Sequence, residues 1–255
     1  MTIIHRVEQN STEWYRLRMG IPTASEFDNI ITPAGKETSS ERRRKYMARL
    51  IAERLLKWQA DSLEKIEHIQ NGKMMEPFAV AQYEEITGVE TEQVGFMTTD
   101  DGRIGASPDR LIVGKPFVLE VKCPSIPIQT YYLAFGHAEH YKPQVQGQLY
   151  VAGQEHGERG DFIAYNKLCP QWITTTERDV PYIAKMHEYL DRFCDELDEA
   201  TERVRKMGTF QPFLDVLTPE EAARLDGSQQ ATGDPLDDAW GTDRAALATQ
   251  RAAAW

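Results

Sequence analysis

The chain has 255 residues, of which 29 are Lys or Arg and 40 are Asp or Glu, so its formal net charge is −11. This acidic balance argues against a histone-like or architectural protein, but it is compatible with a nucleic-acid enzyme that has a local basic groove. Apolar residues make up 41% of the chain, which argues against a wholly disordered protein. No apolar run approaches the roughly 20 residues that span a bilayer, the N-terminus lacks a signal-peptide core, and the three cysteines form no CxxC pair. We therefore expect a cytoplasmic protein without membrane association.

Three helices are predicted in the N-terminal third of the chain. Capping-box patterns, in which Thr is followed three residues later by Glu, begin at Thr23 and Thr38. The first pattern predicts a short helix over 23–31, and the second precedes a longer helix over 41–58. A third helix is predicted over about 73–87, where a glycine follows as its terminator.

The middle of the chain alternates strand and helix signals. The predicted elements are strands over 103–113 and 116–122 joined by a tight turn at Gly114-Lys115, helices over 131–136 and 140–153, strands over 160–166 and 171–178, and a long amphipathic helix over 180–206. On that last helix the side chains expected to point inward are Ile183, Met186, Leu190, Phe193 and Leu197. This order predicts an α/β domain with a mixed central β-sheet flanked by helices.

The composition changes near residue 210. Residues 211–255 contain eight acidic and three basic residues and are rich in Ala, Gly, Gln and Thr. We therefore expect one domain over 1–210, followed by an acidic and mostly irregular C-terminal tail over 211–255 in which 218–225 forms a short helix.

The most informative chemistry lies between Ser107 and Lys122. Successive side chains on a strand alternate faces, so Glu120 and Lys122 point to the same side of the second predicted strand. The tight turn brings Asp109 beside Glu120, and two converging carboxylates, together with the carbonyl of Val121, form an oxygen-rich site suited to Mg²⁺ or Mn²⁺. The alternative is an ordinary solvent-exposed Glu-x-Lys pair.

Five motifs occur in a fixed order along the chain. They are WYRLRMGIPTASE over 14–26, NGKMME over 71–76, ASPD over 106–109, LEVKCP over 119–124 and YKPQVQ over 141–146. With this set the sequence resembles the phage lambda exonuclease family of recombination nucleases, which lies within the PD-(D/E)xK restriction-endonuclease-like superfamily. The resemblance implies a restriction-endonuclease-like fold for the first domain.

The resemblance also implies the roles of the acidic residues. Asp109 and Glu120 would hold the catalytic metal with the carbonyl of Val121, and Lys122 would be the third member of the catalytic signature. Glu76 would join the metal site through water or a second ion, so that two Mg²⁺ ions, with Mn²⁺ as a substitute, would lie about 3.5–4 Å apart. The alternative for Glu76 is an ordinary first-turn helix acid that the helix dipole favours.

Members of the family recognise a terminal 5′-phosphate, and matching groups occur here. Arg18 suits a two-point grip on phosphate oxygens, and Ser25 lies at a predicted helix start, where backbone N–H groups attract anions. Ser107, two residues before Asp109, is a further candidate phosphate ligand. The alternatives are a surface ion pair for Arg18 and simple helix-start chemistry for Ser25.

Two further groups of side chains are candidate DNA contacts. Gln144 is the glutamine that the resemblance selects, although Gln146 and Gln148 flank it and the sequence leaves open which one reaches DNA. Arg42 and Arg43 lie at a predicted helix start, where cations oppose the helix dipole. That placement indicates an anionic partner, for which DNA phosphate and an acidic face of the protein itself are the alternatives.

Taken together, the resemblance implies a Mg²⁺-dependent 5′→3′ exodeoxyribonuclease. Such an enzyme digests one strand of linear double-stranded DNA to mononucleotides and leaves 3′ single-stranded tails for recombination. The resemblance also implies a homotrimeric ring around DNA and a single-strand annealing protein as partner. The alternatives are another nuclease of the superfamily, such as a restriction endonuclease or junction resolvase, and a non-catalytic module that binds DNA ends.

Overall fold

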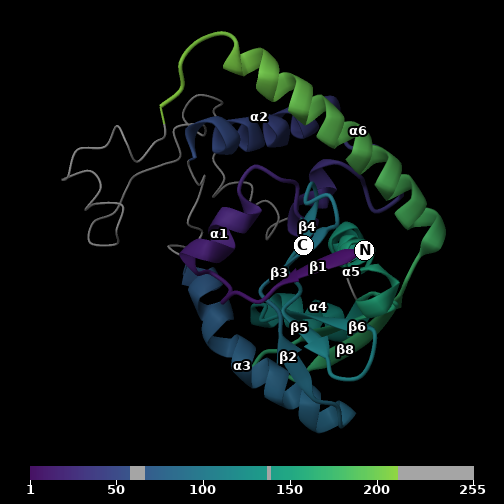
Figure 1. Ribbon diagram of the computed structural model, residues 1–255. Coiled ribbons are helices and arrows are strands. Elements are labelled where there is room, and N and C mark those ends of the chain that lie inside the picture. The colour runs from purple at the N-terminus through teal and green to yellow at the C-terminus, as the bar shows by residue number, and fades with distance from the viewer. Residues whose placement is uncertain (58–66, 137–138, 212–255) are drawn as a thin grey trace.

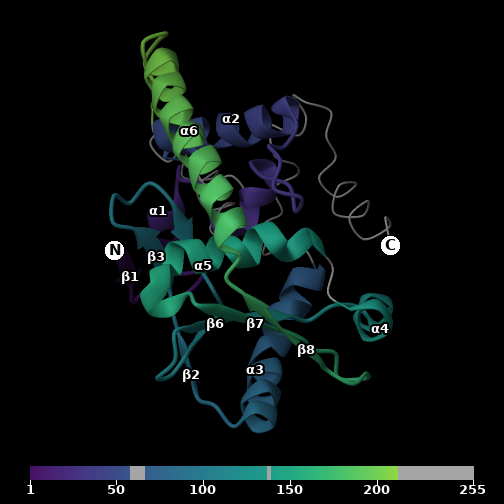
Figure 2. The same cartoon turned by 90° about the vertical axis from the view of Figure 1, so that its right-hand side faces the viewer.

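Strand β6 (Phe117–Lys122), which carries the Glu-x-Lys pair, lies at the centre of a five-stranded sheet in the computed structural model. The structure describes residues 1–57, 67–136 and 139–211. The tail predicted over 211–255, apart from its first residue, lies outside the described residues, as does its short helix. The described residues form two sheets flanked by helices (Figures 1 and 2), which confirms the predicted mixed α/β class.

The two sheets differ in size and in strand direction. The larger sheet has the order β2-β5-β6-β7-β8 and is antiparallel except for the parallel pair β6 and β7. The smaller sheet has the order β1-β3-β4 and is antiparallel throughout. Besides β6, the strands are β1 (Thr2–His5), β2 (Thr91–Gln93), β3 (Phe96–Thr99), β4 (Gly105–Ala106), β5 (Arg110–Ile112), β7 (Arg159–Ala164) and β8 (Trp172–Glu177).

Helices connect and cover these strands. In chain order they are α1 (Thr12–Arg18), the 3-10 helix η1 (Ala24–Asn29), α2 (Ser40–Leu56), α3 (Glu67–Thr87), α4 (Ile126–Phe135), the 3-10 helix η3 (Glu139–Tyr141), α5 (Lys142–His156) and α6 (Val180–Arg205). Among the described residues, no helix is both long enough and apolar enough to cross a membrane.

Different helices cover the two faces of β6. Leu119 and Val121 pack against α3 on one face, whereas Val118 packs on the other face into the cluster that contains α5. Because side chains alternate along a strand, Glu120 shares the face of Val118 and points toward α5. The parallel connection from β6 through α4 and α5 to β7 therefore places a helix directly over the candidate catalytic pair (Figure 2).

The predicted ends of two helices agree with the structure to within one residue. α3 ends at Thr87, and Gly88 follows with a φ of +67° and donates its N–H to the carbonyl of Glu84, although the helix begins earlier than predicted. α6 ends one residue short of the prediction and lies against α2 (Figure 1). All the side chains expected to point inward from α6 are buried: Ile183, Met186, Leu190, Phe193 and Leu197.

Both predicted capping boxes are wrong in detail. Thr23 precedes a 3-10 helix rather than an α-helix, and its extended backbone forms a β-bridge with Gly105 while its hydroxyl makes no cap bond. Thr38 donates its hydroxyl to the carbonyl of Asp28, so α2 starts after Ser39, which makes no side-chain cap bond either. The Thr38 hydroxyl thus bonds a carbonyl ten residues earlier, whereas the Thr23 hydroxyl lies near Arg18 and Ser25.

The single strand predicted over 103–113 is also wrong, because it is two strands in different sheets. β4 pairs with β3 in the smaller sheet, whereas β5 pairs with β6 in the larger one. Pro108 has no N–H to donate to a ladder, and the chain passes between the sheets at Ser107, Pro108 and Asp109. This loop, rather than a strand, is what carries Asp109 to β6.

Candidate active site

Asp109 lies beside Glu120 because its loop is hydrogen-bonded to β6. The backbone N–H of Asp109 donates to the carbonyl of Leu119 at 3.1 Å. The backbone N–H of Val121 donates to Asp109 Oδ2 at 2.6 Å. The structure thus brings together the two carboxylates that the sequence analysis selected, one from a loop and one from a strand.

Three side chains donate to the buried carboxylate of Glu120, which is 2% exposed. Its Oε1 accepts hydrogen bonds from Lys122 Nζ and Gln144 Nε2, each at 2.5 Å. Its Oε2 accepts one from Gln148 Nε2, also at 2.5 Å. These donors replace the water that a carboxylate loses on burial.

The charges of this group perturb one another. Burial raises the pKa of Asp109 well above its usual value, and the nearby carboxylates of Glu120 and Glu76 raise it further. Burial acts to lower the pKa of Lys122, but Glu120, together with Tyr141 and Asp109, outweighs burial and raises it. Lys122 is therefore a protonated cation at neutral pH, suited to stabilise negative charge.

Glu76 reaches the same group of charges from α3. The Arg110 guanidinium Nη1 lies 3.7 Å from Glu76 Oε1. Burial, with Glu76 and Asp109 adding to it, raises the pKa of the adjacent Cys123 thiol to about 12. Cys123 is therefore protonated at neutral pH and is a poor nucleophile there.

The donor set fits a hard divalent cation. The carboxylates of Asp109, Glu120 and Glu76 and the carbonyl of Val121 all present oxygen, the donor that Mg²⁺ and Mn²⁺ prefer. The repulsion that raises the pKa of Asp109 is the kind that a bound cation relieves. In the described part of the chain, no three His, Cys, Asp or Glu side chains are already arranged as a metal-ligand set, so binding requires a rearrangement of these side chains.

Arg18 packs between aromatic rings near Ser25. Its guanidinium carbon lies 4.2 Å from the centroid of the Trp14 ring and 5.6 Å from that of Phe96. Its Nη2 is 3.4 Å from Thr23 Oγ1 and 3.5 Å from Ser25 Oγ. Burial lowers the pKa of Arg18, and no carboxylate of the described residues lies within ion-pair distance of it. A guanidinium in this setting is suited to bind an external anion.

The hydroxyl of Ser107 is occupied within the protein. It donates to the carbonyl of Gly95 at 2.5 Å and accepts a hydrogen bond from Trp14 Nε1 at 2.9 Å. The structure therefore shows Ser107 holding the loop that leads to Asp109. Contact of Ser107 with phosphate stays a prediction.

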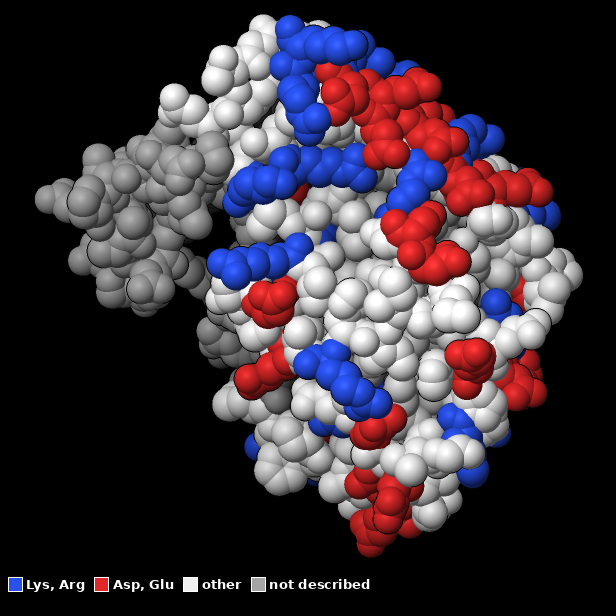
Figure 3. All heavy atoms as spheres, in the orientation of Figure 1, with Lys and Arg blue, Asp and Glu red and all other residues white. Residues whose placement is uncertain are grey.

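Arg42 and Arg43 pair with acidic groups of the protein itself. Arg42 Nε donates to Asn29 Oδ1 at 2.8 Å, and its guanidinium is ion-paired with Asp28. Arg43 is 8% exposed. Figure 3 shows acidic side chains in a row along α6 with basic side chains beside them at α2.

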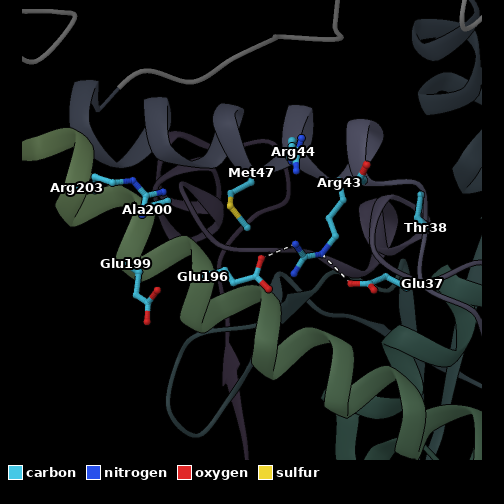
Figure 4. Close-up of a pocket in the computed structure, with 10 residues that line it drawn as sticks. Glu37, Thr38, Arg43, Arg44, Met47, Glu196, Glu199, Ala200 and Arg203 are labelled. Carbon is cyan, nitrogen blue, oxygen red and sulfur yellow. Dashed lines mark hydrogen bonds and ion pairs between the residues drawn. The ribbon is translucent and has the colours of Figure 1, made fainter.

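A hollow of about 510 Å³ lies between α2 and α6 at Arg43. Figure 4 shows the Arg43 guanidinium between two carboxylates, with its Nη1 2.5 Å from Glu196 Oε2 and its Nε 3.3 Å from Glu37 Oε1. The intramolecular acidic partner that the sequence left open thus accounts for both arginines. Contact of either one with DNA stays a prediction, and it requires these ion pairs to open.

Residues 13–155, more than half of the chain, match the family model of the YqaJ-like viral recombinase domain. The chain belongs to this family. The matched range contains the whole group of charges around β6 together with Arg18. No curated protein matches the chain.

Solved structures of exonucleases share the fold of this chain. An alkaline exonuclease, LHK-Exo, from Laribacter hongkongensis is 28% identical with a TM-score of 0.67, over 77% of this chain and 97% of that one. LHK-Exo in complex with dAMP gives 29% identity with the same TM-score and coverage. A phage-related exonuclease from Haemophilus somnus 129PT is 14% identical with a TM-score of 0.51, over 81% of this chain and 98% of that one, which is a likeness of fold alone. Family and structural likeness together indicate a nuclease.

The structure separates the three glutamines by the groups they contact, while which of them reaches DNA stays a prediction. Gln144 and Gln148 both face Glu120, whereas Gln146 donates to the carbonyl of Glu177 and accepts from the N–H of Asp179. Residues four apart share a helix face, so the spacing of Gln144 and Gln148 was the signal for this pairing.

Two supporting residues carried no local signal for their role. In the sequence, Arg110 has no feature that sets it apart from other strand residues. Trp14 donates a hydrogen bond to Ser107, which is far from it in sequence. Only the folded chain shows that each contacts the candidate site.

Proposed function

We propose that this protein is a Mg²⁺-dependent 5′→3′ exodeoxyribonuclease that digests one strand of linear double-stranded DNA to mononucleotides. The observation that carries the proposal is the convergence of Asp109 and Glu120, with Lys122 bonded to Glu120, in a chain of the viral recombinase family. The likeness to an alkaline exonuclease supports it, and the dAMP complex of that relative is consistent with mononucleotide products.

Asp109, Glu120 and the carbonyl of Val121 would hold the metal, and Glu76 would contribute to the same site or to a second ion. When bound, Mg²⁺ supplies Lewis-acid charge that stabilises the developing charge on the phosphoryl oxygens. Lys122, held protonated beside Glu120, would neutralise further negative charge on the phosphate under attack. Gln144 and Gln148 would fix the orientation of the Glu120 carboxylate from α5.

Arg18 would set the preferred end of the substrate. Its guanidinium has no carboxylate partner among the described residues and faces Ser25 and Thr23. A terminal 5′-phosphate would supply the missing anion through charge-assisted hydrogen bonds. Recognition of this group would place the first phosphodiester bond near the carboxylates, which accounts for the 5′→3′ direction.

The resemblance extends the proposal to assembly and partners. We expect a homotrimeric ring around the duplex and cooperation with a single-strand annealing protein, which would coat the 3′ tails left by digestion. We also propose that residues 1–210 form the nuclease domain, that the acidic tail lies outside it, and that the protein acts in the cytoplasm.

This function is tested by comparing the degradation of a linear duplex with that of a covalently closed circular duplex of the same sequence. With Mg²⁺ or Mn²⁺ the protein should degrade the linear DNA from its 5′ ends and leave the circle intact. Cleavage of the circle would favour a restriction endonuclease or junction resolvase instead. Equal DNA binding with and without metal, and no turnover of either DNA, would favour a non-catalytic end-binding module.

A further inference from the structure

Trp14 touches both the candidate phosphate-binding group and the loop that carries Asp109. The face of its ring lies against the Arg18 guanidinium at 4.2 Å. Its ring N–H donates to the Oγ of Ser107 and to the carbonyl of Gly95, each at 2.9 Å. One side chain of α1 is therefore in contact with two parts of the site that are far apart in sequence.

Side-chain hydrogen bonds from the N-terminal segment support the loop from Ser107 to Asp109. Pro108 interrupts the strand pairing at this point, so the loop lacks a continuous ladder of backbone bonds. Trp14 holds the hydroxyl of Ser107, and Gln9 Nε2 donates to the carbonyl of Pro108 at 3.0 Å. Two side chains from the N-terminal segment thus hold Ser107 and Pro108, in addition to the hydrogen bonds that join Asp109 to Leu119 and Val121 of β6.

Arg18, by contrast, makes few close polar contacts with the described residues. Its distances to the hydroxyls of Thr23 and Ser25 are 3.4 and 3.5 Å, which is the outer limit of a hydrogen bond. The close contact is the stacking of its guanidinium on the Trp14 ring, an arrangement favoured by the electrostatics of the ring face. The Trp14 ring therefore fixes the direction in which Arg18 points.

We propose that Trp14 is a positioning residue that sets the phosphate-binding guanidinium of Arg18 at a fixed place relative to Asp109. The inference rests on the proposed function. The ring face of Trp14 acts on Arg18 and through it on binding of the 5′-phosphate. The ring N–H acts on Ser107 and through it on the catalytic loop. The two effects are separable by substitution.

Trp14→Phe keeps an aromatic face and loses the N–H, whereas Trp14→Leu loses both. Each variant is compared with the wild type on duplexes with 5′-phosphate and 5′-hydroxyl ends, with kcat and KM measured separately. In Trp14→Leu the preference for 5′-phosphate over 5′-hydroxyl ends should fall about tenfold, because KM for the phosphorylated duplex rises. Trp14→Phe should keep that preference within about twofold and lower kcat about fivefold.

A coupling experiment separates positioning from general stability. In an Arg18→Gln background, Trp14→Leu should cause no further loss of phosphate preference, because Arg18 is the group through which the ring acts. Independent, multiplicative losses would overturn the proposal. It would also be overturned if both Trp14 variants kept the wild-type KM and kcat, or if both lost activity only in parallel with a fall in Tm.

The same assays distinguish this inference from the proposed function. A wild-type protein that fails to degrade linear duplex with Mg²⁺ contradicts the exonuclease function itself. A wild-type protein that is active and prefers 5′-phosphate, with Trp14 variants that behave identically to it, contradicts only the role of Trp14.

Discussion

Tyr83 joins α3 to the central sheet through one buried hydrogen bond, and Tyr83→Phe removes that bond while keeping the ring. The hydroxyl donates to Asp161 Oδ2 at 2.5 Å, and the two residues are 1% and 3% exposed. Asp161 keeps hydrogen bonds from Arg159 at 2.8 and 3.0 Å and from Thr175 at 2.9 Å, so its carboxylate stays satisfied. The cost is therefore that of one hydrogen bond to a charged group, about 1.5–3 kcal/mol. It falls short of the loss of about 3–5 kcal/mol expected when a buried ion pair is broken.

Thermal denaturation followed by circular dichroism measures this cost. A loss of about 2 kcal/mol lowers the Tm of a domain of this size by about 4–8 °C. Tyr165→Phe is the matched control, because Tyr165 packs beside the same cluster and its hydroxyl has no hydrogen bond in the described chain. Its Tm should stay within about 1 °C of the wild type. A Tyr83→Phe protein as stable as the control would refute the reasoning.

Tyr83→Phe has a second consequence, because Glu76 precedes Tyr83 by two turns on α3. A looser α3 holds Glu76 less firmly near Asp109. Under the proposed function, half-maximal activity of Tyr83→Phe therefore requires more Mg²⁺ than that of Tyr165→Phe. Identical Mg²⁺ titrations for the two variants would show that Tyr83 does not support the metal site.

Two further pairs of variants test the packing of α5. Gln148→Leu removes the donor to the buried Glu120 Oε2, so activity should fall about tenfold and the free energy of unfolding should fall by about 1–3 kcal/mol. Gln146→Leu breaks two backbone contacts and should lower stability by a similar amount, but it leaves the donors to Glu120 in place, so activity should stay near that of the wild type. In Gly147→Ala the new Cβ would lie 2.4 Å from the buried ring of Phe27, so the free energy of unfolding should fall by about 1–3 kcal/mol. Gly208→Ala meets open space and should leave stability unchanged; equal effects of the two alanines would contradict the packing argument.

The sequence was sufficient to predict those features that depend on residues close together in the chain. The interval within Glu120-Val-Lys122 fixes a shared strand face, and a turn before β6 brings Asp109 to it. The amphipathic period of α6 likewise identified its buried face. These features follow from chain geometry over a few residues, and so they were predictable.

The parts that the sequence did not reveal depend on distant partners. The Thr38 hydroxyl caps nothing, because a carbonyl ten residues earlier competes for it. Arg43 pairs with Glu196, and Trp14 donates to Ser107, although the two partners of each pair are far apart in the sequence. No periodicity records such pairs, since they exist only after the sheets and helices have packed. The break between β4 and β5 at Pro108 is different. A proline inside a predicted strand argues against a continuous strand, so this break could have been predicted from the sequence.

The most direct test of the central claim is digestion of a linear duplex by Asp109→Asn. The substrate carries a labelled 5′-phosphate, and release of labelled mononucleotide is measured with and without Mg²⁺. The wild type should release label only with Mg²⁺, and Asp109→Asn should release almost none while keeping the wild-type fold and DNA binding. Full Mg²⁺-dependent release of label by Asp109→Asn would contradict the assignment of the active site.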